Sequence, residues 1–319
     1  MIKKLARSIL NNKNIIEKKE IDLTVQFIDE NSFKSKRIFS DIGEDAASIK
    51  DNDKFVLVTT DRIKTDYIMN YPFGAGFSSI LVGIDDIFCC GGKPLAASLI
   101  LSFKDIDIGQ QIVEGICEGS NKFQVPIIRG HTNPNSDHYE LSSTLIGEIE
   151  KGAYISAKTA KVNDDIILAV DFEGKVAKAS KYYWDTVTFK TSEAVLKKRT
   201  SLNSIAEKKI ANSSKDISNG GIFGTTLQLI KYSNVGADIN VKSIRIPPNL
   251  VDLDYSIEDY ARMYLTTSYI LTASSKYSEE ILSIFKKFGL HASIIGKVIQ
   301  DTHLLRINDG ETSLDVLKF

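Results

Sequence analysis

The sequence is poor in the residues that mark disulfide scaffolds and zinc sites. Its 319 residues include three cysteines, four histidines and one tryptophan. The cysteines, Cys89, Cys90 and Cys117, are an odd set without a Cys-x-x-Cys pair, and the histidines are too scattered to suggest zinc ligation. A disulfide framework or a structural zinc site is therefore not expected. We predict that the adjacent Cys89 and Cys90 are buried free thiols.

An excess of charge of one sign is also absent. The 40 Lys and Arg residues and the 41 Asp and Glu residues leave a formal net charge of -1. No block of like charge stands out, so nothing predicts binding to nucleic acid or to an anionic membrane surface. We find no apolar stretch of the roughly 18 residues that a membrane span needs, and no apolar core of a signal peptide. The expected location is the cytoplasm.

The signatures of several common enzyme sites are missing as well. No G-x-x-x-x-G-K-[ST] phosphate loop and no G-x-S-x-G nucleophile turn occur. Gly74-Ala75-Gly76 lacks the third glycine of a dinucleotide fingerprint and follows no clear strand, so we interpret it as the entry to a helix. These absences exclude a Walker-type nucleotide site and the commonest hydrolase signal.

What is present is a pattern of alternating strands and helices in two halves. The length is enough for two domains with ordinary cores, at 43% hydrophobic residues. Residues 1–37 read as helical and polar. Expected strands are 42–49, 55–60, 95–103, 125–128, 141–149, 166–170, 269–272 and 292–298, and expected helices are 72–90, 108–123, 222–230 and 279–288. This pattern predicts an α+β (α/β) fold with domains at 1–155 and 156–319.

Short acidic clusters with glycines nearby are the most informative feature. They are Gly43-Glu44-Asp45, Thr59-Thr60-Asp61, and Asp85-Asp86 ahead of Gly91-Gly92. Such oxygen ligands suit Mg²⁺ and the phosphates that Mg²⁺ carries. A hairpin turn near Asp53 would place Asp45 opposite Asp61, where like charges destabilise the pairing unless a cation compensates. A slipped register, with both carboxylates in water, is the alternative.

Two further segments allow two interpretations each. Asp85 and Asp86 fall near the end of a predicted helix, where carboxylates oppose the helix dipole; they are either solvated or close to a metal or a lysine. Asp216-Ile217-Ser218-Asn219-Gly220-Gly221 precedes an apolar helix. This segment is either a phosphate-binding helix start or an ordinary N-cap with Ser218 or Asn219 as the cap.

Taken in order, these motifs resemble the superfamily of aminoimidazole ribonucleotide (AIR) synthase, thiamine-monophosphate kinase, selenophosphate synthetase and the hydrogenase maturation protein that dehydrates carbamoyl groups. The resemblance covers residues 40–300. It rests on Gly43-Glu44-Asp45-Ala46-Ala47, Thr59-Thr60-Asp61, Asp86 to Pro94, Gly130-His131-Thr132, Asp216 to Gly220, and Ile295-Gly296-Lys297-Val298. Gly130 to Pro134 and Tyr183 to Thr186 look most similar to the AIR synthase-related proteins that include the methanogenesis marker 2 group.

The resemblance implies an ATP site between two domains and a homodimer. In the family, a mixed sheet of the N-terminal α/β domain builds a barrel with a second subunit, and the C-terminal domain is α+β. Carried over by position, Asp45, Asp61 and Asp86 would hold Mg²⁺. The nucleotide would contact Gly43, Gly130, His131 and Thr132 from the first domain and Asp216 and Ser218 from the second. No motif marks a catalytic residue.

The implied chemistry is phosphoryl transfer from ATP to an oxygen of a small-molecule acceptor. Three departures from the family pattern bear on this: Glu44 replaces an aspartate, Asn219 replaces a second metal-binding aspartate, and Arg129 replaces a glycine. The absence of a reactive cysteine before Gly43 argues against selenophosphate synthesis. The alternatives are a nucleotide-binding protein with little or no catalysis, and a dimeric assembly partner. ATP turnover and ATP binding distinguish the three.

Overall fold

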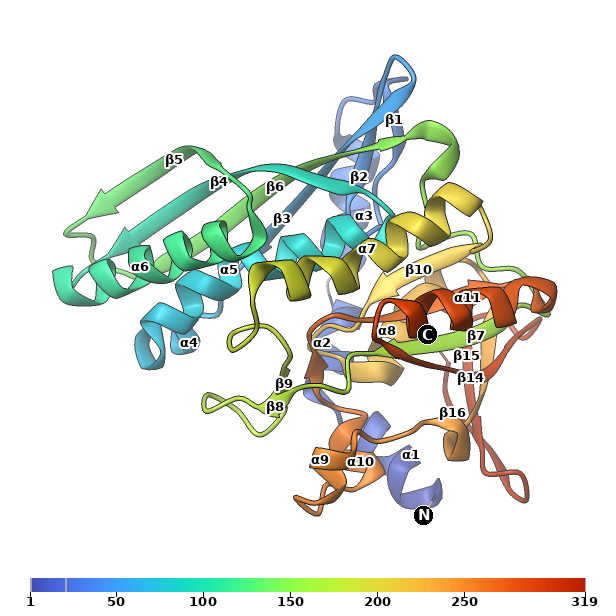
Figure 1. The fold of residues 1–319 in the computed structure, drawn as a ribbon. Helices are drawn as coiled ribbons and strands as arrows, with labels where there is room; N and C mark the ends of the chain where they lie inside the picture. The colour runs from blue at the N-terminus through green and yellow to red at the C-terminus, as the bar shows by residue number, and fades with distance from the viewer. Residues whose placement is uncertain (1, 21, 319) are drawn as a thin grey trace.

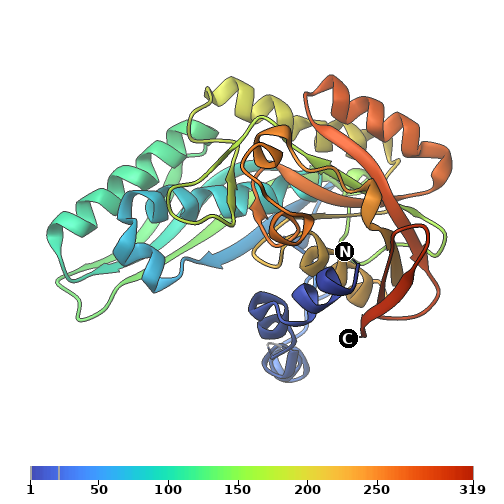
Figure 2. The ribbon, with the colours of Figure 1, turned by 90° about the horizontal axis from the view of Figure 1, so that it is seen from below.

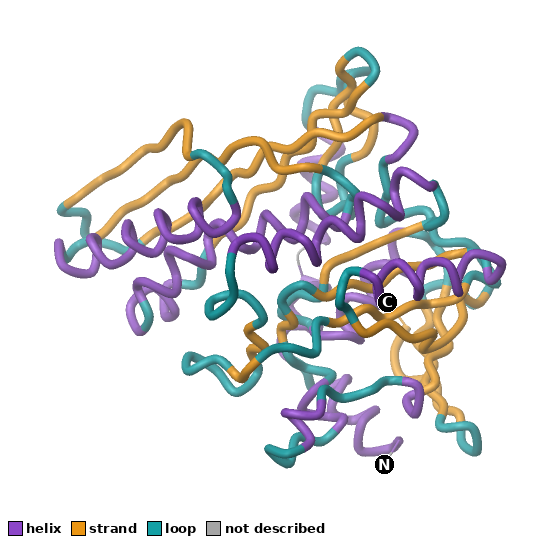
Figure 3. The backbone as a smooth tube through the Cα atoms, in the orientation of Figure 1, coloured by secondary structure: helices purple, strands orange, loops and turns teal. Residues whose placement is uncertain are grey.

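The computed structural model describes residues 2–20 and 22–318. Two mixed sheets, one of six strands and one of seven, form the centres of its N-terminal and C-terminal parts (Figure 1). Figure 3 shows how helices and strands alternate along most of the chain. The predicted two-domain α+β architecture is therefore confirmed, while the boundary between residues 155 and 156 stays a prediction.

The N-terminal part begins with three helices and continues as a sheet with its own helices. Its elements are α1 (Ile2–Leu10), α2 (Lys13–Glu20), α3 (Asp22–Asn31), β1 (Ile38–Ser40), β2 (Ala47–Asp51), β3 (Lys54–Arg62), α4 (Thr65–Asn70), α5 (Pro72–Cys89), β4 (Lys93–Phe103), α6 (Ile106–Phe123), β5 (Ile127–Pro134), β6 (Glu140–Glu150) and a 3-10 turn, η1 (Lys151–Ala153). The strand order is β1-β2-β3-β6-β4-β5, antiparallel except for β4 with β5.

Helices α4, α5 and α6 lie on one face of this sheet (Figures 1 and 2). Along β6, buried residues alternate with half-buried ones, as expected for a sheet with one covered face. The contact between α5 and α6 is close where it contains glycines: a side chain at Gly76 would meet the carbonyl of Ile112, and one at Gly115 would meet the carbonyl of Phe73. Ile128 on the edge strand β5 remains exposed.

The C-terminal part is a sheet with helices on both faces. Its elements are β7 (Asp165–Val170), β8 (Lys175–Val176), β9 (Tyr183–Asp185), α7 (Ser192–Lys208), β10 (Ser213–Asp216), α8 (Gly221–Tyr232), β11 (Gly236–Asn240), η2 (Val241–Ser243), α9 (Pro248–Val251), α10 (Ile257–Tyr260), β12 (Tyr264–Leu265), β13 (Ser268–Ala273), α11 (Ser275–Lys287), β14 (His291–Ile299), β15 (Leu304–Asn308) and β16 (Ser313–Lys318). The order of the large sheet is β10-β13-β7-β14-β11-β15-β16.

The central strand β7 shows how this sheet is covered. All of its residues are buried. Ile167 and Ala169 pack into the core that contains α7 and α11, whereas Ile166 and Leu168 pack into the core that contains α8 and α1. The first helix of the chain, α1, thus lies against the C-terminal sheet, where it contacts β15, β16 and α10.

Two findings differ from the sequence analysis. A three-stranded sheet, β12-β9-β8, was not expected, because strands of two or three residues are too short to show a period. Helix α5 is also long and apolar enough, by length and composition, to cross a membrane, contrary to the expectation that no such stretch exists. In the structure 72% of it is buried inside the protein. It is the core helix of the N-terminal part.

Candidate metal and nucleotide site

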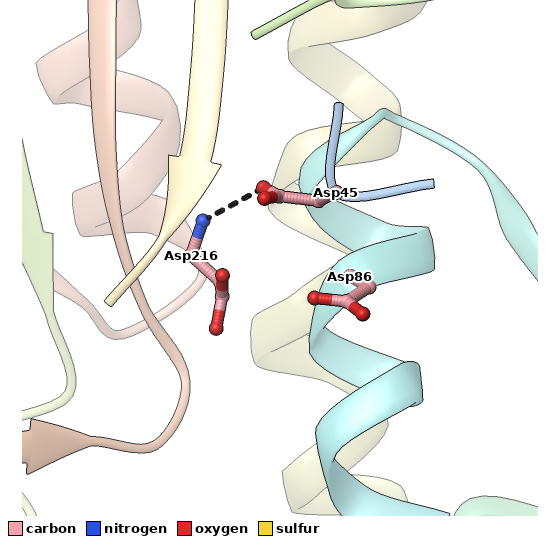
Figure 4. A group of neighbouring side chains, drawn as sticks. All are labelled: Asp45, Asp86 and Asp216. Atoms are coloured by element: carbon pink, nitrogen blue, oxygen red, sulfur yellow. Dashed lines mark hydrogen bonds between the residues drawn. The ribbon is translucent and has the colours of Figure 1, made fainter. Parts of the chain in front are cut away.

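Three aspartates from distant parts of the sequence meet between the two sheets (Figure 4). Asp45 lies in the loop before β2, Asp86 in the last turn of α5, and Asp216 at the end of β10. One carboxylate oxygen of each lies within 4.8 Å of the others. The structure therefore brings together two of the predicted metal ligands with one residue that was predicted to face the phosphates.

Asp45 reaches this cluster by a different route from the one predicted. In the β2–β3 hairpin Ala47 pairs with Val58 and Asp51 pairs with Lys54. Asp45 lies outside this ladder and does not pair with Asp61. The predicted register is wrong by one residue. Asp45 instead contacts the C-terminal part, where its Oδ1 pairs with the Lys215 ammonium and its Oδ2 accepts a hydrogen bond from the Asp216 amide at 3.2 Å.

A buried cysteine also contacts Asp45. The Cys89 thiol donates to Asp45 Oδ2 at 2.7 Å, and burial raises the pKa of this thiol well above its ordinary value. Cys89 and Cys90 are both free and buried, as predicted. The protonated thiol is thus a fixed donor to the carboxylate. Sequence reasoning had no signal for this contact, because Cys89 reads as an ordinary core residue.

Asp86 and Asp61 are close to each other and strongly desolvated. Burial, together with the charges of Asp61 and Asp216, raises the pKa of Asp86 well above its ordinary value, although Thr59 donates a hydrogen bond to its Oδ2 at 2.6 Å. Burial also raises the pKa of Asp61. Its Oδ2 is buried and has no hydrogen-bond partner among the described residues.

The carboxylates of Asp61 and Asp86 fit a divalent cation. Mg²⁺ takes oxygen ligands, and a buried carboxylate oxygen without a donor has an open position for such a ligand bond. A cation near Asp86 would also favour the ionised carboxylate that burial opposes.

The neighbouring acid, Asp85, has a structural role instead. Its carboxylate is buried and its Oδ1 accepts from Arg199 Nε of α7 at 2.9 Å. The backbone amide of Thr267 and the Tyr269 hydroxyl also approach it, each at 3.5 Å. The solvated alternative for Asp85 is therefore wrong, and its partner is an arginine rather than a lysine or a metal.

A cavity of about 440 Å³ opens beside the acidic cluster, between α4 and α5 of one part and β9, β12 and the start of α8 of the other. Its lining combines acidic, aromatic and basic side chains. The acids are Asp61, Asp86 and Asp216, the aromatics are Tyr67, Tyr182, Tyr183 and Tyr264, and the cations are Arg62, Lys64 and Arg262. Asp45 does not line the cavity. An anionic ligand with a flat ring system matches this lining.

The start of α8 lies at the same cavity through Ser218 and Asn219. Gly220 is the N-cap and gives no side-chain hydrogen bond, so the predicted ordinary cap by Ser218 or Asn219 is not formed. Gly221 has φ +64°, and a side chain there would meet the carbonyl of Ala261. The amides of Gly221 and Ile222 at this helix start already donate to the carbonyls of Ser218 and Ala261, at 2.8 Å and 3.0 Å. Phosphate binding at the start of α8 therefore stays a prediction.

The other nucleotide-site predictions lie elsewhere. Gly43 has φ +88° and packs under the ring of Tyr232, which gives it a structural reason to be glycine. Gly130, His131 and Thr132 lie on the edge strand β5, exposed, and do not line the cavity within one chain. Their contact with a nucleotide stays a prediction.

The residues that depart from the family pattern also have defined places. Glu44 accepts from the Ser156 hydroxyl and from the Ala157 amide, both at 2.6 Å, and so holds the segment between the two parts. Arg129 is exposed and donates to the carbonyl of Gly130 at 3.1 Å. Asn219 lines the cavity. Only the last of these three faces the candidate site.

Family models match both parts of the chain. Residues 43–149 match the N-terminal domain of AIR synthase related protein, and residues 171–306 match its C-terminal domain. The chain belongs to the AIR synthase related protein family. The family resemblance inferred from the sequence is therefore confirmed, whereas closeness to the methanogenesis marker 2 group stays a prediction.

Relatives and solved structures support the family and its fold. An uncharacterised protein of Methanocaldococcus jannaschii is 35% identical, covering 100% of this chain and 97% of its own. Thiamine-monophosphate kinase of Buchnera aphidicola is 25% identical, covering 95% of each.

Among structures, T. maritima PurL in complex with ATP has a TM-score of 0.71 at 16% identity, over 88% of this chain and 47% of the PurL chain. AaThiL in complex with AMPPCP and TMP has a TM-score of 0.66 at 18% identity, over 91% and 92%. At such identities these structures establish the shared fold.

Proposed function

We propose that this protein is an ATP- and Mg²⁺-dependent enzyme that transfers the phosphoryl group of ATP to an oxygen of a small molecule. The observation that carries the proposal is that the Asp86 and Asp216 carboxylates lie close together and line a cavity between the two parts of the chain. The names of the relatives agree with it, since thiamine-monophosphate kinase is a phosphotransferase and PurL was solved with ATP.

The residues of the chain divide into three roles in this proposal. Asp61, Asp86 and Asp216 would hold Mg²⁺, and bound Mg²⁺ would neutralise phosphate charge and orient the phosphoryl group. Ser218 and Asn219, in the turn before α8, line the cavity and would face the phosphates. Arg262 at the cavity would attract an anionic ligand and oppose its release.

The tyrosines of the cavity give its wall a surface for a flat ring. Tyr183 and Tyr264 contact edge to face with ring centroids 5.4 Å apart, on the paired strands β9 and β12. Such rigid aromatic side chains bind a planar ligand at little cost in conformational entropy. They exclude water from the region next to the carboxylates, where phosphoryl transfer requires protection from hydrolysis.

We also propose that the protein is a cytoplasmic homodimer with domains 1–155 and 156–319, as the family resemblance implies. The exposed side chains of Ile100 and Ile128 on the N-terminal sheet support the dimer, because an uncovered apolar sheet face favours association. Analytical ultracentrifugation of the purified chain measures its oligomeric state directly. A single monomeric species at micromolar concentration would contradict the proposed homodimer.

The decisive experiment is calorimetric titration with a non-hydrolysable ATP analogue, with and without Mg²⁺. We expect micromolar affinity that depends on Mg²⁺, and a loss of at least tenfold in Asp216→Asn, because a charged ligand of the cation is removed. Asp252→Asn, an exposed carboxylate after α9, is the matched control and should bind as the parent does. No binding with or without Mg²⁺ would refute the proposal. Binding without turnover of ATP by any acceptor would select the nucleotide-binding alternative.

A further inference from the structure

We propose that Lys215 is a built-in cation of the acidic cluster, and that it limits the site to one divalent cation. The inference deepens the proposed function and rests on it only for the identity of the ligand, an ATP–metal complex. Its basis is the arrangement of Lys215, Asp45 and the carboxylates of the cavity.

Lys215 lies in a buried strand of the large sheet and not on the protein surface. It is the third residue of β10, a strand whose four residues are all buried, and it pairs with Ile270 of the inner strand β13. Its side chain is only 8% exposed and forms an ion pair with Asp45, whose side chain is 3% exposed. A lysine is rarely buried to this extent unless a carboxylate accompanies it, because desolvation of the ammonium must be offset.

Asp45 is already engaged by donors on both of its oxygens. Lys215 pairs with Oδ1, while the Cys89 thiol and the Asp216 amide donate to Oδ2 at 2.7 Å and 3.2 Å. The cavity is lined by the other three acids, Asp61, Asp86 and Asp216, and not by Asp45. The arrangement therefore assigns Asp45 to hold the ammonium, while the other three carboxylates face the cavity in which a divalent cation would bind.

The ammonium then opposes a second divalent cation. An ion bound to Asp45 and Asp216 would lie within a few ångströms of Lys215, because the cluster atoms of these aspartates are within 4.8 Å of one another. Repulsion between a unit charge and a divalent ion at this distance is large in a partly desolvated site. The neutral Asn219 at the same cavity removes a further ligand that a second ion would need. Both residues reduce the negative charge that the site offers.

The test is to count bound Mn²⁺ in a protein whose Lys215 charge has been removed. Mn²⁺ is a paramagnetic stand-in for Mg²⁺, and the free ion is measured by electron paramagnetic resonance during titration, first alone and then with a non-hydrolysable ATP analogue. We expect one ion per parent chain with the analogue. We expect two ions in Lys215→Met, or a gain of at least about tenfold in Mn²⁺ affinity without nucleotide, because the repulsive charge is gone. Lys215→Arg, which keeps the charge, should behave as the parent.

Two further variants separate the effect of the Lys215 charge from a failure to fold and from the loss of any buried lysine. Lys215→Gln retains a hydrogen-bond donor for Asp45 and serves if Lys215→Met does not fold. Lys198→Met is the matched control, since Lys198 is equally buried and pairs with Asp171 at 2.7 Å outside the cavity; its Mn²⁺ binding should not change.

Two ions in the parent chain, or unchanged number and affinity in both charge-removing variants, would overturn the inference. So would a failure of Mn²⁺ to bind any of these proteins. Failure of the ATP analogue alone to bind would refute the proposed function but leave the comparison of Mn²⁺ affinities as a test of Lys215.

Discussion

The buried ion pair between Asp85 and Arg199 should carry much of the coupling between the two parts of the chain. Asp85 lies on α5 and Arg199 on α7, their side chains are 3% and 0% exposed, and Oδ1 and Nε are 2.9 Å apart. Asp85→Asn leaves the guanidinium buried without its counter-charge, and its Nη2 already has no partner among the described residues. Breaking such a pair from one side typically costs about 3–5 kcal/mol. We expect Asp85→Asn to lower the free energy of unfolding by that amount.

The pair offers a complete double-mutant cycle. Arg199→Met leaves Asp85 with the weaker donors Thr267 and Tyr269, so it should destabilise by a similar amount. Replacement of both partners, Asp85→Asn with Arg199→Met, should cost far less than the sum of the single changes, because no charge is left unpaired.

Urea unfolding of the four proteins, followed by circular dichroism, measures these free energies. The exposed pair of Lys208 and Glu280 is the control, and its removal should cost less than about 1 kcal/mol. If Asp85→Asn costs less than about 1 kcal/mol, or if the two single changes simply add, the reasoning is refuted.

Two other predictions concern stability. Gly115→Ala places a methyl group against the carbonyl of Phe73, and overpacking of this kind should lower the free energy of unfolding by about 1–3 kcal/mol; an unchanged urea midpoint would show that α5 and α6 can move apart. Burial lowers the pKa of His291 below its ordinary value of 6.5, so the folded state disfavours the imidazolium that the unfolded chain readily forms. The contribution of His291 to stability should therefore be complete well above pH 6.5 and decrease as the pH falls below it, which thermal unfolding between pH 8 and pH 5 measures. The same series on His291→Gln should lack this part of the slope, and an identical slope in both proteins would contradict the assignment.

Much of the fold was predictable because the longer elements have a clear period and clear ends. Helix α5 was expected over residues 72–90 from apolar residues at helical spacing and the Gly91-Gly92-Lys93-Pro94 terminator, and it spans Pro72–Cys89. Strands β11, β15 and β16 were not assigned. These three strands lie side by side at one end of the large sheet. Polar residues occupy several positions in each strand, so the apolar pattern of each is short.

The site was predictable where a residue type alone suggests its chemistry. Asp86 and Asp216 were singled out as acids beside glycines, and the fold brings them together. Lys215 was missed, because a lysine in Ser-Ser-Lys-Asp reads as a solvated side chain until the pairing of β10 with β13 shows that it is buried. Asp85 looks identical to Asp86 in the sequence. Only the helix rotation, which turns one toward Arg199 and the other toward the cavity, separates their roles.

The position of α1 has a consequence for synthesis of the chain on the ribosome. The apolar face of α1, with Ile2, Leu5 and Ile9, is buried against the C-terminal part, and two of the strands it contacts, β15 and β16, are made long after it. At roughly 5–20 residues per second, the about 300 residues between α1 and β15 take on the order of 15–60 s to translate. During this interval the six-stranded sheet can complete itself while α1 still lacks its binding surface. Helix α1 therefore leaves the ribosome well before it can be fixed, and its apolar face stays accessible to chaperones until β15 and β16 have been made.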